Sequence, residues 1–250
     1  MAPDTLIKLM VWFVDLHPGN LLLSLSEQET WPVEKMNAIC GAPRTLPVTR
    51  IDGMPLDDSV PQYGVEEALG RFSDISLYSG AIKLSDFGCA FFADDPPREI
   101  DFFGPYIVPE QYCTGHIGPP SDVWTLGCAI FLILSGRDVF GIPDDSTGKV
   151  FSIMTDTLGE PPEYILRSWK SRVSEDFHVS KNPSRPLAAR IQEMRYGNEV
   201  LGMKNRQDEF SDGDISLLTD LLSSIFRYEP DERLTMEAIL EHPAIAVFGG

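Results

Sequence analysis

Residues 82–90 read Ile-Lys-Leu-Ser-Asp-Phe-Gly-Cys-Ala, and the rest of the chain can be arranged around them. Apolar Ile82 and Leu84 alternate with polar neighbours, which is the period of a short strand. Gly88 allows the backbone to turn after that strand, because glycine adopts conformations closed to other residues. The pattern therefore predicts a strand that delivers the carboxylate of Asp86 to a cleft.

A second acidic loop lies upstream, at residues 15–20, where the sequence reads Asp-Leu-His-Pro-Gly-Asn before an apolar run at 21–23. The carboxylate of Asp15 can accept a proton from a hydroxyl group. Asn20 and Asp86 offer the hard oxygen ligands that Mg²⁺ prefers. Together the two loops predict the charge-handling end of a phosphoryl-transfer site.

Three further motifs follow downstream. They are Val-Pro-Glu at 108–110, Ser-Asp-Val-Trp-Thr-Leu-Gly-Cys at 121–128, and Pro-Asp-Glu-Arg-Leu-Thr at 230–235. With the two loops, they make the chain resemble the eukaryotic protein kinases, whose catalytic loop places an Asn five residues after its Asp and whose metal-binding Asp opens Asp-Phe-Gly. The order of all five motifs carries the resemblance, because Asp-Phe-Gly by itself occurs in many exposed turns.

The resemblance implies an activity and a role for each motif. The expected reaction is transfer of the ATP γ-phosphate to a serine or threonine of a protein, with Asp15 as the base. Mg²⁺ is expected at Asn20 and Asp86, and ATP at these two residues and His17. The expected structural supports are Phe87, Gly88, Glu110, Asp122 and Arg233. In the family the glutamate forms a buried ion pair with the arginine, and the helix aspartate accepts hydrogen bonds from the backbone of the catalytic loop.

The residues beside Asp15 depart from the family pattern. Phe13 and Val14 stand where the family usually has His-Arg, and the arginine ordinarily binds a phosphate on the activation segment. Tyr106 is the only hydroxyl-bearing residue between Gly88 and Pro109. A switch operated by phosphorylation of this segment is therefore not expected. His17 replaces a common lysine, and it either contacts phosphate or forms a hydrogen bond within its own loop.

Only fourteen residues precede Asp15. A kinase small lobe, with its Gly-rich loop, β3 lysine and αC glutamate, is therefore expected to be missing. The fold class predicted is α+β, a protein-kinase-like fold made mainly of the α-helical C-terminal lobe with a few short strands. Residues 1–250 are expected to form one such large lobe, and its activity as an isolated polypeptide is expected to be impaired.

An insertion separates the two acidic loops. Residues 24–79 fill a gap that is a short hairpin in most kinases, and their turn-rich composition predicts a flexible segment. Within it, residues 54–56 and 65–69 are the candidates for a docked segment and a helical turn. An insertion at this position resembles that of the SR-protein kinases and their fungal relatives, which implies an Arg/Ser-rich protein substrate.

The composition limits which binding partners and which cell compartment can be expected. A formal net charge of −18 disfavours nucleic acid and anionic membranes as partners and suits cationic peptides. The four cysteines are far apart, which is typical of free thiols in a reducing compartment. The longest apolar run, 123–134, contains a threonine and is too short to span a bilayer of ~30 Å. A soluble protein of the cytoplasm or nucleus is expected.

Periodicity and end signals predict several helices. The most apolar helix should begin with Asp122 as its N-cap and end before Gly136. Further helices are expected from Pro161-Pro162 to near Lys170 and Arg172, around 187–196, and through Ile215, Leu218, Leu222 and Ile225. A last helix should start at Thr235 and close at His242-Pro243.

Two other functions remain open at this stage. A pseudokinase or scaffold would use the same lobe to bind partners without catalysis. A small-molecule phosphotransferase of the aminoglycoside or choline kinase type shares a similar acidic loop at 15–20. The motifs at 108–110, 121–128 and 230–235 favour a protein kinase over the second of these.

Overall fold

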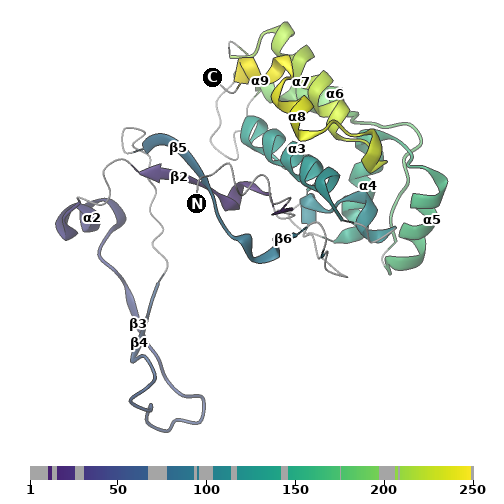
Figure 1. Cartoon of the computed structure of the whole chain (residues 1–250). Coiled ribbons are helices and arrows are strands. Elements are labelled where there is room, and N and C mark those ends of the chain that lie inside the picture. The colour runs from purple at the N-terminus through teal and green to yellow at the C-terminus, as the bar shows by residue number, and fades with distance from the viewer. Residues whose placement is uncertain are drawn as a thin grey trace. The chain divides into compact units, whose positions relative to one another are not determined.

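The computed structural model describes residues 11–12, 16–25, 31–66, 78–92, 95, 104–113, 117–141, 146–174, 176–196, 206–207 and 209–248 (Figure 1). The chain divides into two compact units. Unit 1 comprises Met1–Leu21 and Leu84–Gly250, and unit 2 is the intervening Leu22–Lys83. Each unit is described by itself.

Unit 1 is mainly helical. Its helices are α3 (Pro119–Ser135), α4 (Thr147–Leu158), α5 (Glu163–Arg172), α6 (Leu187–Gln192), α7 (Asp212–Ile225), α8 (Met236–Leu240) and α9 (Pro243–Phe248). A short antiparallel pair joins β1 (Val11–Trp12) to β6 (Phe91–Phe92). Helix α3 packs against α7, and α6 and α9 pack against α7 in turn.

Helix α3 is the centre of the core, as its apolar sequence predicts. Trp124 and Phe131 are buried in it, and Gly136 ends it in the left-handed conformation at φ 66°. The predicted start is wrong. The helix begins at Pro119, because two prolines fix helical φ angles in its first turn. Asp122 therefore lies inside the first turn and is not the N-cap.

The other helix predictions are mostly confirmed. All four residues of the predicted apolar stripe on α7 (Ile215, Leu218, Leu222, Ile225) are buried. Helix α5 and the 187–196 helix, which finishes as a 3-10 turn, occur where expected. Thr235 caps α8 by accepting a hydrogen bond from the Ala238 amide at 3.2 Å. The chain does not stop being helical at Pro243, because proline is tolerated in the first turn of the following α9.

Helix α4 was not predicted, although its end signals are present. Ser146 caps its N-terminus by accepting from the Lys149 amide, and Gly159 follows its last residue at φ 90°. Its side chain Phe151 stacks on Trp169 of α5, with ring centroids 3.9 Å apart and planes 7° from parallel. The Trp169 indole N–H donates to the Pro109 carbonyl at 3.0 Å. This stack joins two helices to the segment that carries Glu110.

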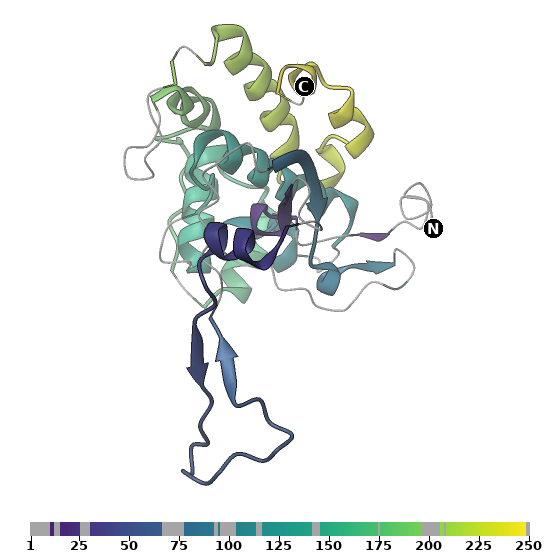
Figure 2. The ribbon, with the colours of Figure 1, turned by 90° about the vertical axis from the view of Figure 1, so that its left-hand side faces the viewer.

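Unit 2 contains one helix and two strand pairs. Helix α2 spans Val33–Cys40, β3 (Thr45–Pro47) pairs with β4 (Tyr63–Val65) in an antiparallel hairpin, and β2 (Leu21–Leu25) pairs with β5 (Tyr78–Leu84). The hairpin strands run side by side (Figure 2). None of the described side chains between Leu22 and Lys83 is buried.

The predictions inside this unit fared poorly. Val65, placed in a helical turn, ends strand β4, because β-branched residues favour extended pairing. Glu66 follows this strand and its amide donates to the Arg44 carbonyl, while 67–69 lie outside the described residues. Residues 54 and 55, predicted as part of a docked segment, are exposed. Helix α2 was not predicted.

No helix within the described parts of the chain has both the length and the apolar character needed to cross a membrane.

Candidate active site

Strand β5 ends at Leu84 and is followed by the predicted turn. Asp86 has φ 57° and ψ 71°, and it is the only non-glycine residue with positive φ in the described parts of the chain. Aspartate tolerates this left-handed conformation, and such strained residues gather at functional sites. The turn was assigned to the wrong residue, since Gly88 itself has no positive φ. A Cβ at Gly88 would lie 3.1 Å from the Asp86 Oδ1 atom, so a larger residue there would crowd this carboxylate.

The loop with Asn20 lies directly beside this turn. Residues Pro18–Asn20 form a 3-10 turn, and Asn20 is buried with 7% of its surface exposed. Its carbonyl oxygen accepts hydrogen bonds from the Ser85 amide at 2.9 Å and from the Ser85 hydroxyl at 3.2 Å. Ser85 immediately precedes Asp86, so the two predicted metal ligands sit on adjoining backbone segments.

Three residues of the predicted catalytic loop fall outside the described part of the chain. They are Phe13, Val14 and the predicted base, Asp15. The structure gives these residues no geometry, and Asp15 stays a prediction from the sequence.

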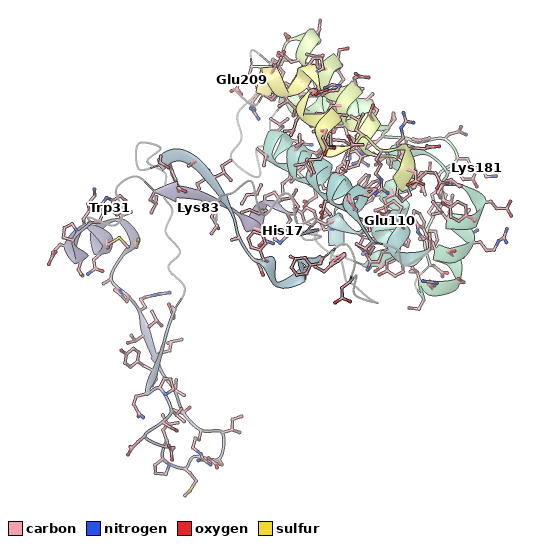
Figure 3. All side chains as sticks on the ribbon, viewed as in Figure 1. His17, Trp31, Lys83, Glu110, Lys181 and Glu209 are labelled. Atoms are coloured by element: carbon pink, nitrogen blue, oxygen red, sulfur yellow. The ribbon has the colours of Figure 1, made fainter. Side chains whose placement is uncertain are left out.

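His17 forms the hydrogen bond within its own loop that the sequence allowed. Its Nδ1 atom accepts from the Gly19 amide at 3.1 Å. Its ring also lies against Tyr106, with centroids 5.4 Å apart and planes at 39° (His17 is labelled in Figure 3). A phosphate contact at His17 stays a prediction.

The expected ion pair between Glu110 and Arg233 is present and buried. The two guanidinium nitrogens donate to the two carboxylate oxygens at 2.8 and 2.7 Å. The exposed fractions of the two residues are 4% for Glu110 and 6% for Arg233. Glu110 is labelled in Figure 3 among the helices of unit 1. A bidentate pair of this kind fixes position as well as charge.

Several partners of this pair were not predicted from the sequence. Ser121 donates its hydroxyl to Glu110 at 2.7 Å, and the Pro120 carbonyl accepts from Arg233 at 2.7 Å. The guanidinium carbon lies 4.9 Å from the Trp124 ring centre. Ser121 and Trp124 belong to the motif at 121–128. The sequence therefore singled out the segment that contains them, but it did not predict their contacts with Glu110 and Arg233.

Asp122 and Phe87, two of the predicted structural supports, lie in different surroundings. The 3-10 turn that carries Asn20 packs against α3, the helix that contains Asp122. Phe87, in contrast, has 57% of its surface exposed. An apolar ring so exposed contributes little to the core of the described residues, and a supporting role for Phe87 stays a prediction.

Comparison with known proteins identifies this arrangement. The family model described as "Protein kinase domain" matches residues 75–245. The chain belongs to the protein kinase domain family. The predicted kinase-like fold is thereby confirmed, while the loop at 15–20 lies before the matched residues.

Curated kinases show the same relationship. The chain is 30% identical over 174 residues to the dual specificity protein kinase lkh1 of Schizosaccharomyces pombe, covering 69% of this chain and 25% of lkh1. It is 28% identical to the serine/threonine-protein kinase AFC3 of Arabidopsis thaliana, covering 66% of this chain and 41% of AFC3. It is 29% identical to the dual specificity protein kinase CLK2 of Mus musculus, covering 68% and 33%. The chain thus spans less than half the length of these kinases.

A solved crystal structure of a kinase domain has a similar fold. It superposes with a TM-score of 0.52 at 20% identity, covering 97% of this chain and 61% of that one. At this identity the likeness concerns the kinase fold alone.

The kinase site offers the donor types that Mg²⁺ requires. The Asp86 carboxylate is exposed, and one of its oxygens accepts only a long hydrogen bond, 3.3 Å, from the Gly88 amide. Asn20 adds an amide oxygen from the adjoining loop. Within the described residues no three His, Cys, Asp or Glu side chains cluster as a metal site. A carboxylate and an amide with room for water and phosphate oxygens still fit Mg²⁺, which rarely has an all-protein cage.

Proposed function

We propose that this chain is the large lobe of a protein kinase that transfers the γ-phosphate of ATP to serine or threonine in a protein substrate. The observation that supports this most strongly is the pair of hydrogen bonds from Ser85 to the Asn20 carbonyl. These bonds hold the loop of Asn20 against the turn of Asp86, as a shared metal site requires. The family match supports kinase chemistry in general.

Each proposed role follows from the chemistry of the side chain. Asn20 and Asp86 would hold Mg²⁺, which neutralises phosphate charge when bound together with ATP. Asp15 would orient the acceptor hydroxyl and take its proton. Glu110, with Arg233 and Ser121, would fix the end of the activation segment, where the peptide is bound. These residues act by positioning, which supplies most of the catalysis in phosphoryl transfer.

The polypeptide 1–250, tested by itself, is proposed to be a poor kinase. Its sequence shows no β3 lysine to bind the α- and β-phosphates, no αC glutamate and no Gly-rich loop. Every ~1.4 kcal/mol of lost transition-state stabilisation lowers the rate about tenfold. Loss of several such contacts is expected to lower turnover by many orders of magnitude.

The test is phosphate transfer by purified 1–250 from labelled ATP and Mg²⁺ to a peptide. The matched control is Asp86→Ala, which removes one proposed metal ligand at an exposed site. Turnover near 1 s⁻¹, the low end for kinases, that is abolished in the control would contradict the proposed impairment. Equal background in both proteins is the expected result.

The proposed substrate is an Arg/Ser-rich protein segment. The net charge of −18 and the long insertion between the two loops support it. Two of the relatives are named dual specificity kinases, so the peptide set should include tyrosine beside serine and threonine. The set should also include a peptide with lysine in place of every arginine, which separates charge from guanidinium recognition. The wide separation of the four cysteines in the sequence supports a reducing compartment such as the cytoplasm or nucleus.

A pseudokinase or scaffold is the second candidate. The exposure of Phe87 beside Asp86 favours it, because an apolar ring at the proposed metal site could serve a partner protein. Nucleotide titrations with and without Mg²⁺ separate the two functions. Binding that strengthens with Mg²⁺ and is lost in Asp86→Ala supports the kinase, and no binding supports the scaffold.

A further inference from the structure

A hydrogen bond at the surface of unit 1 joins helix α5 to the loop that precedes Arg233. The Tyr164 hydroxyl donates to the Glu229 Oε2 atom at 2.5 Å. Tyr164 is the second residue of α5, and 45% of its surface is exposed. Partial burial, and then this hydrogen bond, raise the pKa of Tyr164 above its usual range. The phenol therefore keeps its proton and remains the donor.

Glu229 adjoins the residues that hold the guanidinium group of Arg233. The Arg227 carbonyl accepts from the Arg233 Nε atom at 2.9 Å, and the Tyr228 carbonyl accepts from Nη2 at 3.4 Å. Glu229 follows directly and is the N-cap of a 3-10 turn that ends one residue before the arginine. The 227–232 loop therefore connects a surface hydrogen bond with the buried ion pair.

The same loop has a second contact with the chain between α4 and α5. The Tyr228 hydroxyl donates to the Gly159 carbonyl at 2.8 Å, and the Tyr228 ring lies edge-on to Trp169 with centroids 5.9 Å apart. Tyr228 is partly buried and Trp169 is fully buried, so this contact is protected from solvent. Loss of the Tyr164 contact alone would loosen the loop without detaching it from unit 1.

A cation lies next to Tyr164 on the same helix. Arg167 is three residues further on, so the two side chains are neighbours on the helix surface. Arg167 pairs with Glu163 at 3.0 Å, but the two side chains are 74% and 88% exposed. Water screens such a pair, and the arginine can exchange its partner at little cost. A phosphate group, with about −1.5 to −2 charges at pH 7, is a stronger partner for a guanidinium group than a carboxylate.

Tyr164 is also accessible to another enzyme. Pro162 precedes α5 with φ −49° and ψ 145°, so the chain is extended up to the start of the helix. Helix ends fray readily, and only the first turn of α5 would have to open for the phenol to enter a foreign cleft.

We propose that Tyr164 is an acceptor site for tyrosine phosphorylation, and that its phosphate turns from Glu229 to Arg167 and so releases the 227–232 loop. The Tyr164 oxygen forms a bond to the γ-phosphorus of ATP, and the bond from this phosphorus to ADP breaks. The phenolic proton passes to the base of the modifying tyrosine kinase. The phosphate cannot keep the contact with Glu229, because two anions then face each other with no proton between them. The modification needs no catalysis by this chain, so it goes beyond the proposed function and does not depend on it.

The test of the release uses the 1–250 chain with phosphotyrosine incorporated at position 164 during synthesis. Hydrogen exchange of amides in the 227–232 loop should become about tenfold faster than in the unmodified chain, while amides of α3 stay protected. Glu229→Gln keeps an acceptor but removes the charge, so the phosphate should then have a much smaller effect. The ³¹P signal of the phosphate should titrate at lower pH than that of free phosphotyrosine, and Arg167→Gln should remove this difference.

The matched control is phosphotyrosine at position 196. Tyr196 is 61% exposed and lies in the 3-10 turn Glu193–Tyr196, away from the sequence of α5 and of the loop. Phosphate there should leave exchange in the 227–232 loop unchanged. The release is overturned if phosphate at position 164 does not speed this exchange, or if phosphate at position 196 speeds it equally.

The acceptor itself is tested with the unmodified chain, ATP and a tyrosine kinase of broad specificity, followed by mass spectrometry of peptides. Tyr164 should be modified at least as fast as Tyr196, and Tyr164→Phe should remove only the first of the two phosphopeptides. Phosphate on Tyr196 but not on Tyr164, or on neither, would show that Tyr164 is not an acceptor.

Discussion

The two units of this chain differ in how far their side chains are buried. All buried side chains among the described residues belong to unit 1, whereas unit 2 exposes even Val33 (69%), Val65 (62%) and Ile51 (109%). Burial of apolar surface is the main source of stability, and a two-stranded hairpin is marginal by itself. Unit 2 begins two residues after Asn20 and ends three residues before Asp86. The chain thus carries a long insertion in the sequence between Asn20 and Asp86, and the described part of that insertion adds nothing to the core.

The largest expected difference between the units is in hydrogen exchange. Core amides of α3 and α7 should exchange only on global unfolding, while amides at 31–66 should exchange with little protection. Mass spectrometry of peptic peptides measures both in one sample. Strong protection across most of residues 24–79 would show that the insertion is a stable domain.

Removing the buried guanidinium should have the next largest effect. Arg233→Ala leaves Glu110 charged and unpaired inside the core, and the expected loss of stability is about 3–5 kcal/mol. Urea unfolding followed by tryptophan fluorescence measures it. Arg233→Lys keeps the charge but not the bidentate geometry, and it should lie between alanine and wild type. A melting temperature equal to wild type in Arg233→Ala would mean that the pair contributes nothing.

A pair of glycine substitutions compares the packing of the two units directly. In Gly127→Ala the new Cβ would lie 2.5 Å from Ile225 Cγ2 and 3.0 Å from the Phe226 ring, which predicts a loss of about 1–3 kcal/mol. In Gly64→Ala the new Cβ meets nothing within 4 Å, and the expected change is within about 0.5 kcal/mol. Equal effects in urea unfolding would contradict the difference in packing.

The smallest expected effect concerns the ion pair of unit 2. Arg44 pairs with Glu66, but 76% of the arginine side chain and 30% of the glutamate side chain are exposed. Water screens such a pair, so Arg44→Ala should change stability by less than about 1 kcal/mol. A loss as large as that in Arg233→Ala would show that unit 2 hides a core of its own.

Local signals predicted the parts of the fold that depend on few residues. Gly136 ends α3, Thr235 caps α8, and the spacing of Ile215 and Leu218 marks the buried face of α7. The start of α3 was misplaced because Asp122 is a good cap in isolation, and only the prolines before it show that the helix has already begun. Helix α2 was missed although Val33, Met36 and Cys40 repeat at helical spacing, because the segment is short and stands in a turn-rich stretch.

The site was predictable only in part, for a different reason. The ion pair between Glu110 and Arg233 could be predicted, because both residues belong to motifs of the family that the sequence resembles. The contact between His17 and Tyr106 joins two loops that share no sequence pattern. Asp86 carries the left-handed turn rather than Gly88, and the presence of a glycine in the sequence did not show which position would take this conformation.

The ion pair between Glu110 and Arg233 also determines how late in translation the core of unit 1 can be completed. Glu110 and Arg233 are separated by 123 positions, so nearly half of the chain must be made between them. Contacts of such long range form late, and domains complete folding as units during translation. Until Arg233 leaves the ribosome, the Glu110 carboxylate lacks the guanidinium group with which it forms its buried ion pair. A nascent chain stopped before that point should stay open around α3 and be available to chaperones, and extension of the chain past Arg233 should make it compact.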